Sequence, residues 1–134
     1  IEARLDDLHR RHGVHVTAAR STRVEGSDWL RRVTAAMAAL RSDPPSEVGG
    51  RPVRSVEDLL VGGRLPPSDV LIWLLDGARV VVRPSGTEPK VKCYAEVVVE
   101  PDGSGDVARA RAEARSTVDT VLAGAEELMV GLGL

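Results

Sequence analysis

The chain has 134 residues, of which 43% are hydrophobic and 28% charged, and its formal net charge is −2. Such a composition is typical of one globular domain, and its core must be aliphatic because only 2% of the residues are aromatic. The acidic balance and the few aromatic rings argue against a nucleic-acid partner, which would require a basic surface or stacking platforms. No apolar run approaches the roughly 20 residues of a membrane span, so we expect no membrane partner.

Two residue types that often carry chemistry give no sign of it here. Cys93 is the only cysteine, which excludes an internal disulfide framework and favours a reducing compartment, so we expect a cytoplasmic protein. His9, His12 and His15 have no evident carboxylate or cysteine partners at metal-ligand spacing. We therefore expect surface histidines rather than a metal site.

The first half of the chain predicts a helix end, a strand and a helix. Residues 2–12 have the pattern of the end of a helix, and the charged opening without an initiator Met indicates a piece of a longer protein. Loose alternation predicts a strand over Val14–Val24. A helix follows, and Asp43-Pro44-Pro45 ends it because proline cannot continue a helix. Its expected buried face consists of Leu30, Val33, Met37 and Leu40.

The second half predicts a run of strands and a final helix. A short strand is expected near Pro52–Ser55, although this segment has no clean period. The apolar run Val70–Leu75 predicts a strand that is covered on both faces, or on one face by Trp73. The turn signal Asp76-Gly77 joins it to a partner strand that ends at Arg83.

A further strand and a long helix complete the chain. Residues 91–99 alternate, so that Cys93 faces the core as a small apolar side chain, and residues 107–128 keep helical spacing. The mixed charges on the polar side of this helix are typical of a helix packed on a sheet. The order of elements predicts an α+β two-layer sandwich, with a mostly antiparallel sheet and helices on one face.

Arg83-Pro84-Ser85-Gly86-Thr87-Glu88-Pro89-Lys90 joins two of these strands and has the chemistry of an oxyanion site. An arginine can bind two oxygens at once, hydroxyls donate single hydrogen bonds, and Gly86 lets backbone N–H groups approach closely. The two prolines restrict the loop, so less entropy is lost on binding. Glu88 is an unusual neighbour for an anion, and we interpret it as a loop-structuring residue hydrogen-bonded to backbone rather than as an acid or base.

This octapeptide, followed by Val91-Lys92 and preceded by Leu75-Asp76-Gly77-Ala78-Arg79-Val80, resembles the C-terminal phosphate-binding loop of the α-D-phosphohexomutases. These are the phosphoglucomutases, the phosphomannomutases and their phosphopentomutase-like relatives. The order of elements from Val14 onward is similar to the fourth domain of that family, which has a TATA-binding-protein-like β-α-β4-α fold. The resemblance implies that residues 1–13 are a connector helix from a preceding domain and that residues 14–134 form the C-terminal phosphate-binding domain.

The resemblance also implies a set of site residues. Arg83, Ser85, Gly86, Thr87 and Lys90 would hold the substrate phosphate that is not being transferred. Arg83 would neutralise and orient this phosphate, the two hydroxyl residues would donate hydrogen bonds, and the Gly86 backbone and the Lys90 charge would complete the site. The substrate would be a hexose 6-phosphate or hexose 1-phosphate.

The family's reaction needs parts that this sequence does not contain. A phosphoserine in a Ser-His loop donates its phosphoryl group to the sugar, which passes through a bisphosphorylated intermediate, and an Asp-x-Asp-x-Asp-Arg loop holds Mg²⁺. None of these strings occurs here, so we expect no catalytic residue and no metal ligand in this chain, which would act with preceding domains of the same polypeptide. The alternative is a stand-alone interaction or anion-binding module of the same fold without enzyme activity.

Overall fold

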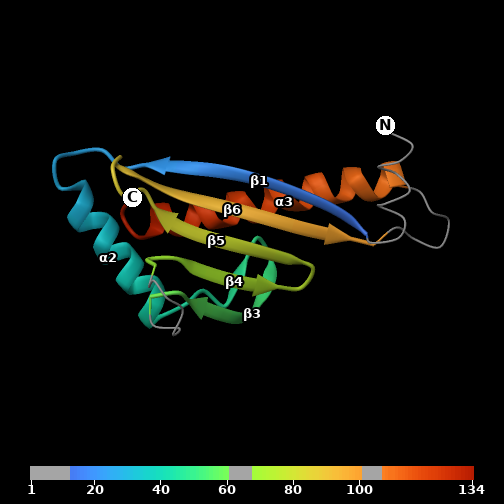
Figure 1. The fold of residues 1–134 in the computed structure, drawn as a ribbon, viewed down its shortest axis with the longest axis horizontal. Coiled ribbons are helices and arrows are strands. Elements are labelled where there is room, and N and C mark those ends of the chain that lie inside the picture. Colours follow the sequence, from blue (N-terminus) through green and yellow to red (C-terminus); the bar gives the residue numbers. More distant parts are fainter. Residues whose placement is uncertain (1–12, 61–67, 101–106) are drawn as a thin grey trace.

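A computed structural model describes residues 13–60, 68–100 and 107–134, which form a six-stranded antiparallel sheet and two helices (Figure 1). The order of strands in the sheet is β1-β6-β5-β4-β3-β2. The expected connector helix lies outside the described residues except for Gly13. In chain order the elements are β1 (Val14–Arg23), α2 (Trp29–Ser42), β2 (Glu47–Val48), β3 (Arg51–Asp58), β4 (Leu71–Leu75), β5 (Ala78–Pro84), β6 (Lys90–Val99) and α3 (Val107–Gly131).

The two longest strands, β1 and β6, pair over their whole length, from Val14 opposite Val99 to Arg23 opposite Lys90. Side chains alternate between the two faces of a strand, and in β6 the buried residues are Val91, Cys93, Ala95 and Val97, as the sequence predicted. Burial raises the pKa of the Cys93 thiol to about 11, so the thiol stays protonated at neutral pH and serves as an apolar core residue.

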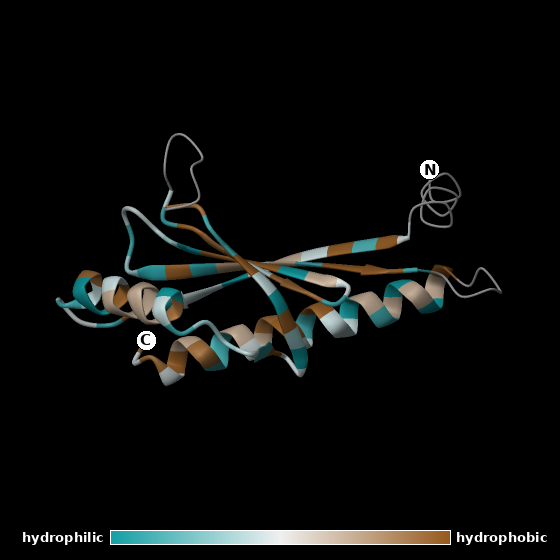
Figure 2. Cartoon of the chain, turned by 90° about the horizontal axis from the view of Figure 1, so that it is seen from below, coloured by the Kyte–Doolittle hydropathy of each residue, from teal (hydrophilic) through white to brown (hydrophobic). Residues whose placement is uncertain are grey.

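Both helices lie on the same side of the sheet, and α3 runs along β1 and β6 (Figures 1 and 2). This arrangement confirms the predicted α+β sandwich with helices on one face. The opposite side of the sheet carries Thr17, Arg79, Val81, Tyr94 and Glu96, and we call it the outer face. The side of α3 that is turned to the sheet is buried along its length at Val107, Ala110, Ala114, Val118, Val121, Leu122, Ala125 and Met129.

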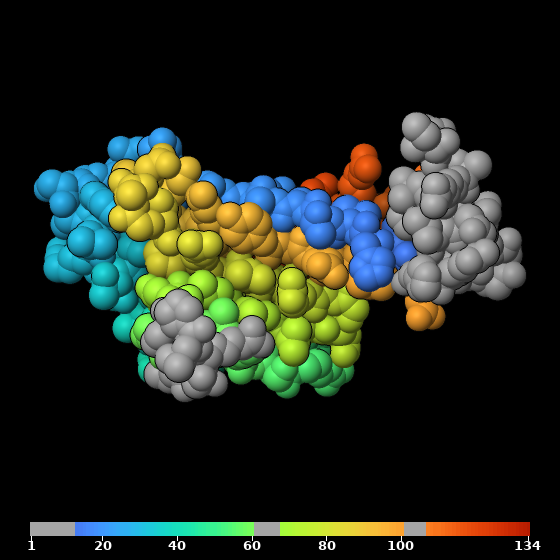
Figure 3. All heavy atoms as spheres, viewed as in Figure 1, coloured from blue at the N-terminus to red at the C-terminus, as the bar shows by residue number. Residues whose placement is uncertain are grey.

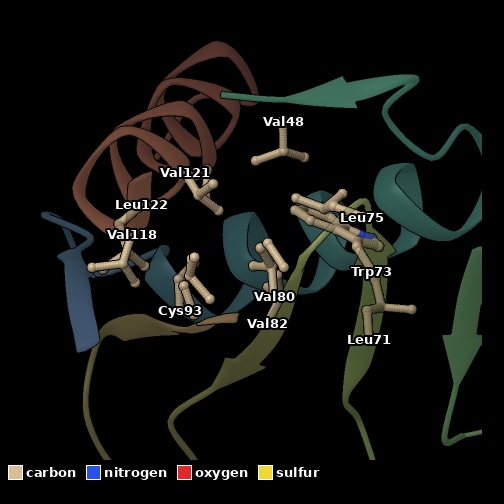
Figure 4. Packing of buried hydrophobic residues seen from close by; sticks show 14 of the residues in the cluster. Val48, Leu71, Trp73, Leu75, Val80, Val82, Cys93, Val118, Val121 and Leu122 are labelled. Atoms are coloured by element: carbon tan, nitrogen blue, oxygen red, sulfur yellow. The ribbon is translucent and has the colours of Figure 1, made fainter. Parts of the chain in front are cut away.

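The core between the layers is aliphatic except for Trp73, which is fully buried on β4 (Figure 4). Leu71, Trp73 and Leu75 point inward while Leu74 is 40% exposed, so β4 is covered on one face only. Val48 of β2 lies between Leu75 and α3 in Figure 4 and is 1% exposed. The β2–β3 turn therefore closes one end of the core.

Backbone packs directly on backbone where this turn meets α3. Gly49 has a φ of +59°, a conformation that suits glycine, and a Cβ atom there would lie 2.8 Å from the Thr120 carbonyl oxygen. A Cβ atom on Gly124 of α3 would lie 2.4 Å from the Gly49 nitrogen. This close approach of the two backbones requires glycine at both positions, and it holds the neighbouring Val48 in the core.

Two details differ from the sequence-based expectation. β3 spans Arg51–Asp58 rather than 52–55, and its register against β4 shifts between Val53 and Ser55. An irregularity of this kind moves side chains to the opposite face, which explains why the segment shows no period of two. Between the helices there are five strands rather than four in the described residues, because Glu47–Val48 pairs with Arg51–Pro52 around a glycine turn.

The buried face of α2 also differs from the prediction. Val33, Met37 and Leu40 are buried as expected, but Leu30 is 62% exposed. Ala36 is buried in its place, and with 100° between successive residues this moves the centre of the buried face away from Leu30. The prediction relied on large apolar side chains and therefore did not include alanine at position 36 in the buried face.

Candidate anion site

The hairpin of β5 and β6 places the loop that the sequence singled out. Gly77, at a φ of +68°, forms the tight turn into β5, and Arg54 fixes this turn through hydrogen bonds of 2.9 and 2.6 Å to the Asp76 carboxylate. These bonds lower the pKa of Asp76. β5 then brings Arg83 to the other end of the sheet, where the loop lies near the start of α2 (Figure 1). Its atoms form part of the molecular surface (Figure 3).

Backbone hydrogen bonds hold the loop closed. The Ser85 N–H donates to the Lys90 carbonyl at 2.9 Å, and the Lys90 N–H donates to the Glu88 carbonyl at 2.8 Å. The Val24 N–H, at the end of β1, donates to the Pro89 carbonyl at 2.8 Å. Main-chain hydrogen bonds thus close the loop between β5 and β6 and also connect it to the end of β1.

The Ser85 hydroxyl organises the tip of the loop. Its oxygen accepts the N–H of Glu88 at 3.2 Å and lies 3.4 Å from the N–H of Thr87. Because a hydroxyl has one hydrogen to donate, this arrangement leaves the Ser85 O–H available to a ligand oxygen. The Ser85 oxygen therefore accepts hydrogen bonds within the loop, while its O–H remains a free donor.

Gly86 presents an open backbone. In the described structure its N–H has no hydrogen-bond partner, and a Cβ atom at this position would meet nothing within 4 Å. The protein itself therefore does not require glycine at position 86. A ligand that approaches this N–H closely would be a reason for it.

The strand register brings further cations to the loop that the sequence reasoning missed. On adjacent strands Arg83 stands opposite Lys92, and Arg23 stands opposite Lys90. Among the described residues, Arg23, Arg83 and Lys92 have no side-chain hydrogen bond or ion pair. Like charges directly opposite each other destabilise a sheet, so the two pairs concentrate unfavourable positive charge at this end of it.

The alternation of β6 would have been enough to predict the position of Lys92. Lys92 lies between the buried residues Val91 and Cys93, so its side chain is on the outer face together with that of Arg83. Arg23 could not have been found in this way. Its position beside the loop depends on the pairing of β1 with β6, across more than sixty residues of sequence.

Lys90 and Glu88 form an ion pair inside the site, with 3.4 Å between Nζ and Oε2. We expected the Glu88 side chain to be hydrogen-bonded to backbone. Instead, the contribution of Glu88 to the loop comes from its main-chain N–H, and its carboxylate faces the lysine. The five predicted site residues are all brought together in one loop, with Lys90 the only one of them held by an acidic side chain.

Other kinds of site find little support in the described ranges. They contain no group of three or more His, Cys, Asp or Glu side chains that could hold a metal ion. His15 lies 3.5 Å from Glu96 on the outer face, while His9 and His12 fall outside the described residues. None of the helices in the described ranges is both long and apolar enough to cross a membrane.

Comparisons with known proteins show which family the chain belongs to. Residues 23–114, which include the whole loop, match the family model of the phosphoglucomutase/phosphomannomutase C-terminal domain. The phosphoglucomutase of Staphylococcus aureus is 31% identical over 105 residues, and the alignment covers 69% of this chain. The probable phosphomannomutase of Haemophilus influenzae is 39% identical over 92 residues, or 68% of this chain.

The alignments cover only 19% and 18% of these two relatives, so the chain spans about a fifth of the length of the curated proteins that it matches. The match falls on one domain of a larger polypeptide, and it includes the hairpin, the loop and most of the sheet. The chain belongs to the phosphoglucomutase/phosphomannomutase family, in which it corresponds to the C-terminal domain.

Proposed function

We propose that this chain is the substrate-phosphate-binding domain of a phosphohexomutase that interconverts hexose 6-phosphate and hexose 1-phosphate through a phosphoserine and a bisphosphorylated sugar. The observation that carries the proposal is the group of unpaired donors around one loop. Arg83, the Gly86 N–H and the Ser85 O–H lie together at the end of the sheet, with Lys92 opposite Arg83.

A phosphate dianion suits these groups better than a neutral sugar does. Arg83 supplies a planar pair of N–H donors, which matches two phosphate oxygens, and Lys90 and Lys92 supply point charges. The Gly86 N–H and the Ser85 O–H supply directional hydrogen bonds from a loop that is already closed by its own main chain. Little order has to be created on binding, which favours affinity.

The chain would contribute position rather than bond breaking. By holding the phosphate that stays on the sugar, it would orient the phosphate that is transferred, and closure of the domain would exclude water from the phosphoserine. The phosphoserine would come from other parts of the polypeptide. The described residues offer no site that fits Mg²⁺, so we derive no step through this ion. We propose a cytoplasmic location, consistent with a buried and protonated Cys93.

Titration calorimetry on the chain tests this proposal. Glucose 6-phosphate, mannose 6-phosphate and inorganic phosphate are expected to bind with similar dissociation constants, on the order of 1 mM for a small and exposed anion site. Glucose and mannose without phosphate are expected to give no heat of binding. Equal binding of the unphosphorylated sugars, or no binding of any phosphate compound, would contradict the proposal.

A further inference from the structure

The anion site contains one acidic side chain, and its position is informative. Glu88 contacts Lys90, whose side chain is only 19% exposed, while the side chain of Glu88 is 51% exposed. The other cations of the site, Arg23, Arg83 and Lys92, have no carboxylate partner within the described structure. The carboxylate therefore pairs with a cation that is itself largely covered by protein, and it leaves the exposed Arg23 and Arg83 without a counter-ion.

The loop does not depend on this carboxylate for its shape. Main-chain bonds join Ser85 to Lys90, Lys90 to Glu88, and Val24 to Pro89, and the Glu88 N–H is held by the Ser85 hydroxyl. All four contacts remain if the Glu88 side chain rotates away. An ion pair that is exposed on one side adds little to stability, so the pair can open easily.

The two partners differ in their freedom to move. Lys90 is mostly covered and cannot follow its partner into solvent, whereas Glu88 is half-exposed and can turn into water at small cost. We propose that Glu88 is an internal counter-ion, which neutralises Lys90 while the site is empty and leaves it when a phosphate group binds. This inference rests on the proposed phosphate site and adds a competing group to it.

The inference predicts that removing the carboxylate charge strengthens binding. In Glu88→Gln, phosphate no longer displaces an ion pair or approaches a negative charge, so affinity for inorganic phosphate is expected to rise about 3- to 10-fold at low salt. If the carboxylate instead held Lys90 in its binding position, the same substitution would weaken binding. The sign of the change separates the two roles.

Glu96→Gln is the matched control, because it changes the net charge by the same amount. Glu96 lies on the same strand pair and the same outer face but pairs with His15 and Arg79, away from the loop. Calorimetry with inorganic phosphate is expected to show the gain in Glu88→Gln and an almost unchanged affinity in Glu96→Gln. Equal gains in phosphate affinity in both variants would show that the effect comes from the overall charge of the chain, and this result would overturn the inference.

A second experiment, in a chain that already carries Lys90→Gln, tests whether Glu88 acts through Lys90. In a Lys90→Gln chain, the gain from Glu88→Gln is expected to shrink, because the ion pair that phosphate displaces is already absent. An undiminished gain contradicts displacement from Lys90. Absence of phosphate binding by the unaltered chain overturns the proposed function and this inference together, whereas binding that Glu88→Gln leaves unchanged or weakens overturns the inference alone.

Discussion

Replacing Arg83 by alanine is expected to weaken binding of glucose 6-phosphate by about 10- to 150-fold, because charge-assisted hydrogen bonds contribute about 1.5–3 kcal/mol. Arg83 is exposed and has no partner among the described residues, so its loss leaves no buried group unsatisfied. The free energy of unfolding should stay the same or rise slightly, since the substitution removes a like charge opposite Lys92. Calorimetry and denaturant unfolding measure the two quantities separately.

Arg79→Ala is the control for this experiment. Arg79 lies on the same strand and the same face, four residues before Arg83, but it is 4.0 Å from Glu96 and outside the loop. The control variant should bind glucose 6-phosphate like the unaltered chain. Similar losses of affinity in both variants would mean that the general charge of the outer face, rather than this loop, attracts phosphate.

Replacing Gly124 by alanine is expected to lower the free energy of unfolding by about 1–3 kcal/mol, the usual range for an overpacked core. The new Cβ atom would lie 2.4 Å from the nitrogen and 2.8 Å from the Cα atom of Gly49, and both are backbone atoms that cannot rotate away. The β2–β3 turn would have to move off α3, which would loosen the buried Val48. Alanine favours a helix by up to about 1 kcal/mol, so the packing loss must exceed that gain.

Gly131→Ala supplies the comparison in the same helix. A Cβ atom on Gly131 meets nothing within 4 Å, so only the helix preference remains and the free energy of unfolding should rise slightly or stay the same. Urea unfolding monitored by circular dichroism measures both variants. A Gly124→Ala chain as stable as Gly131→Ala would show that the turn does not pack on α3 as closely as described.

Local patterns predicted most of the fold. The Asp76-Gly77 turn, the alternation of β6 and the helical spacing of α3 are each set by neighbouring residues, and the structure has them where the sequence indicated. The loop could also be identified as one unit, because Arg83, Ser85, Gly86, Thr87 and Lys90 are close in sequence and joined by a hairpin.

The remaining features depend on contacts between distant residues. The irregular register of β3 removed the two-residue alternation from its sequence. The contact of Gly49 with Gly124 joins two residues that are 75 positions apart in the sequence. Arg23 comes beside Lys90 only through the pairing of β1 with β6. The ion pair of Lys90 with Glu88 was not predicted either, because the spacing of two residues does not decide whether a flexible carboxylate contacts the lysine or the backbone.

The arrangement of cations connects stability with function. Several arginines elsewhere in the described structure are paired, as Arg20 is with Glu126 and Arg41 with Asp58 and Asp69, and the pairing raises the pKa of Arg41. At the loop, by contrast, like charges oppose each other, and of these four cations only Lys90 has a carboxylate partner within the described residues. Such an arrangement has a small stability cost, and a bound dianion would offset it.

Binding of a phosphate group at the β5–β6 loop can be measured residue by residue in a nuclear magnetic resonance titration of the isotope-labelled chain with inorganic phosphate. We expect the largest saturable shifts at the backbone amides of Gly86, Thr87 and Glu88, with smaller changes at Arg83 and Lys92. Shifts centred on the arginines of α3, or no saturable shift in the loop at all, would contradict binding at this loop.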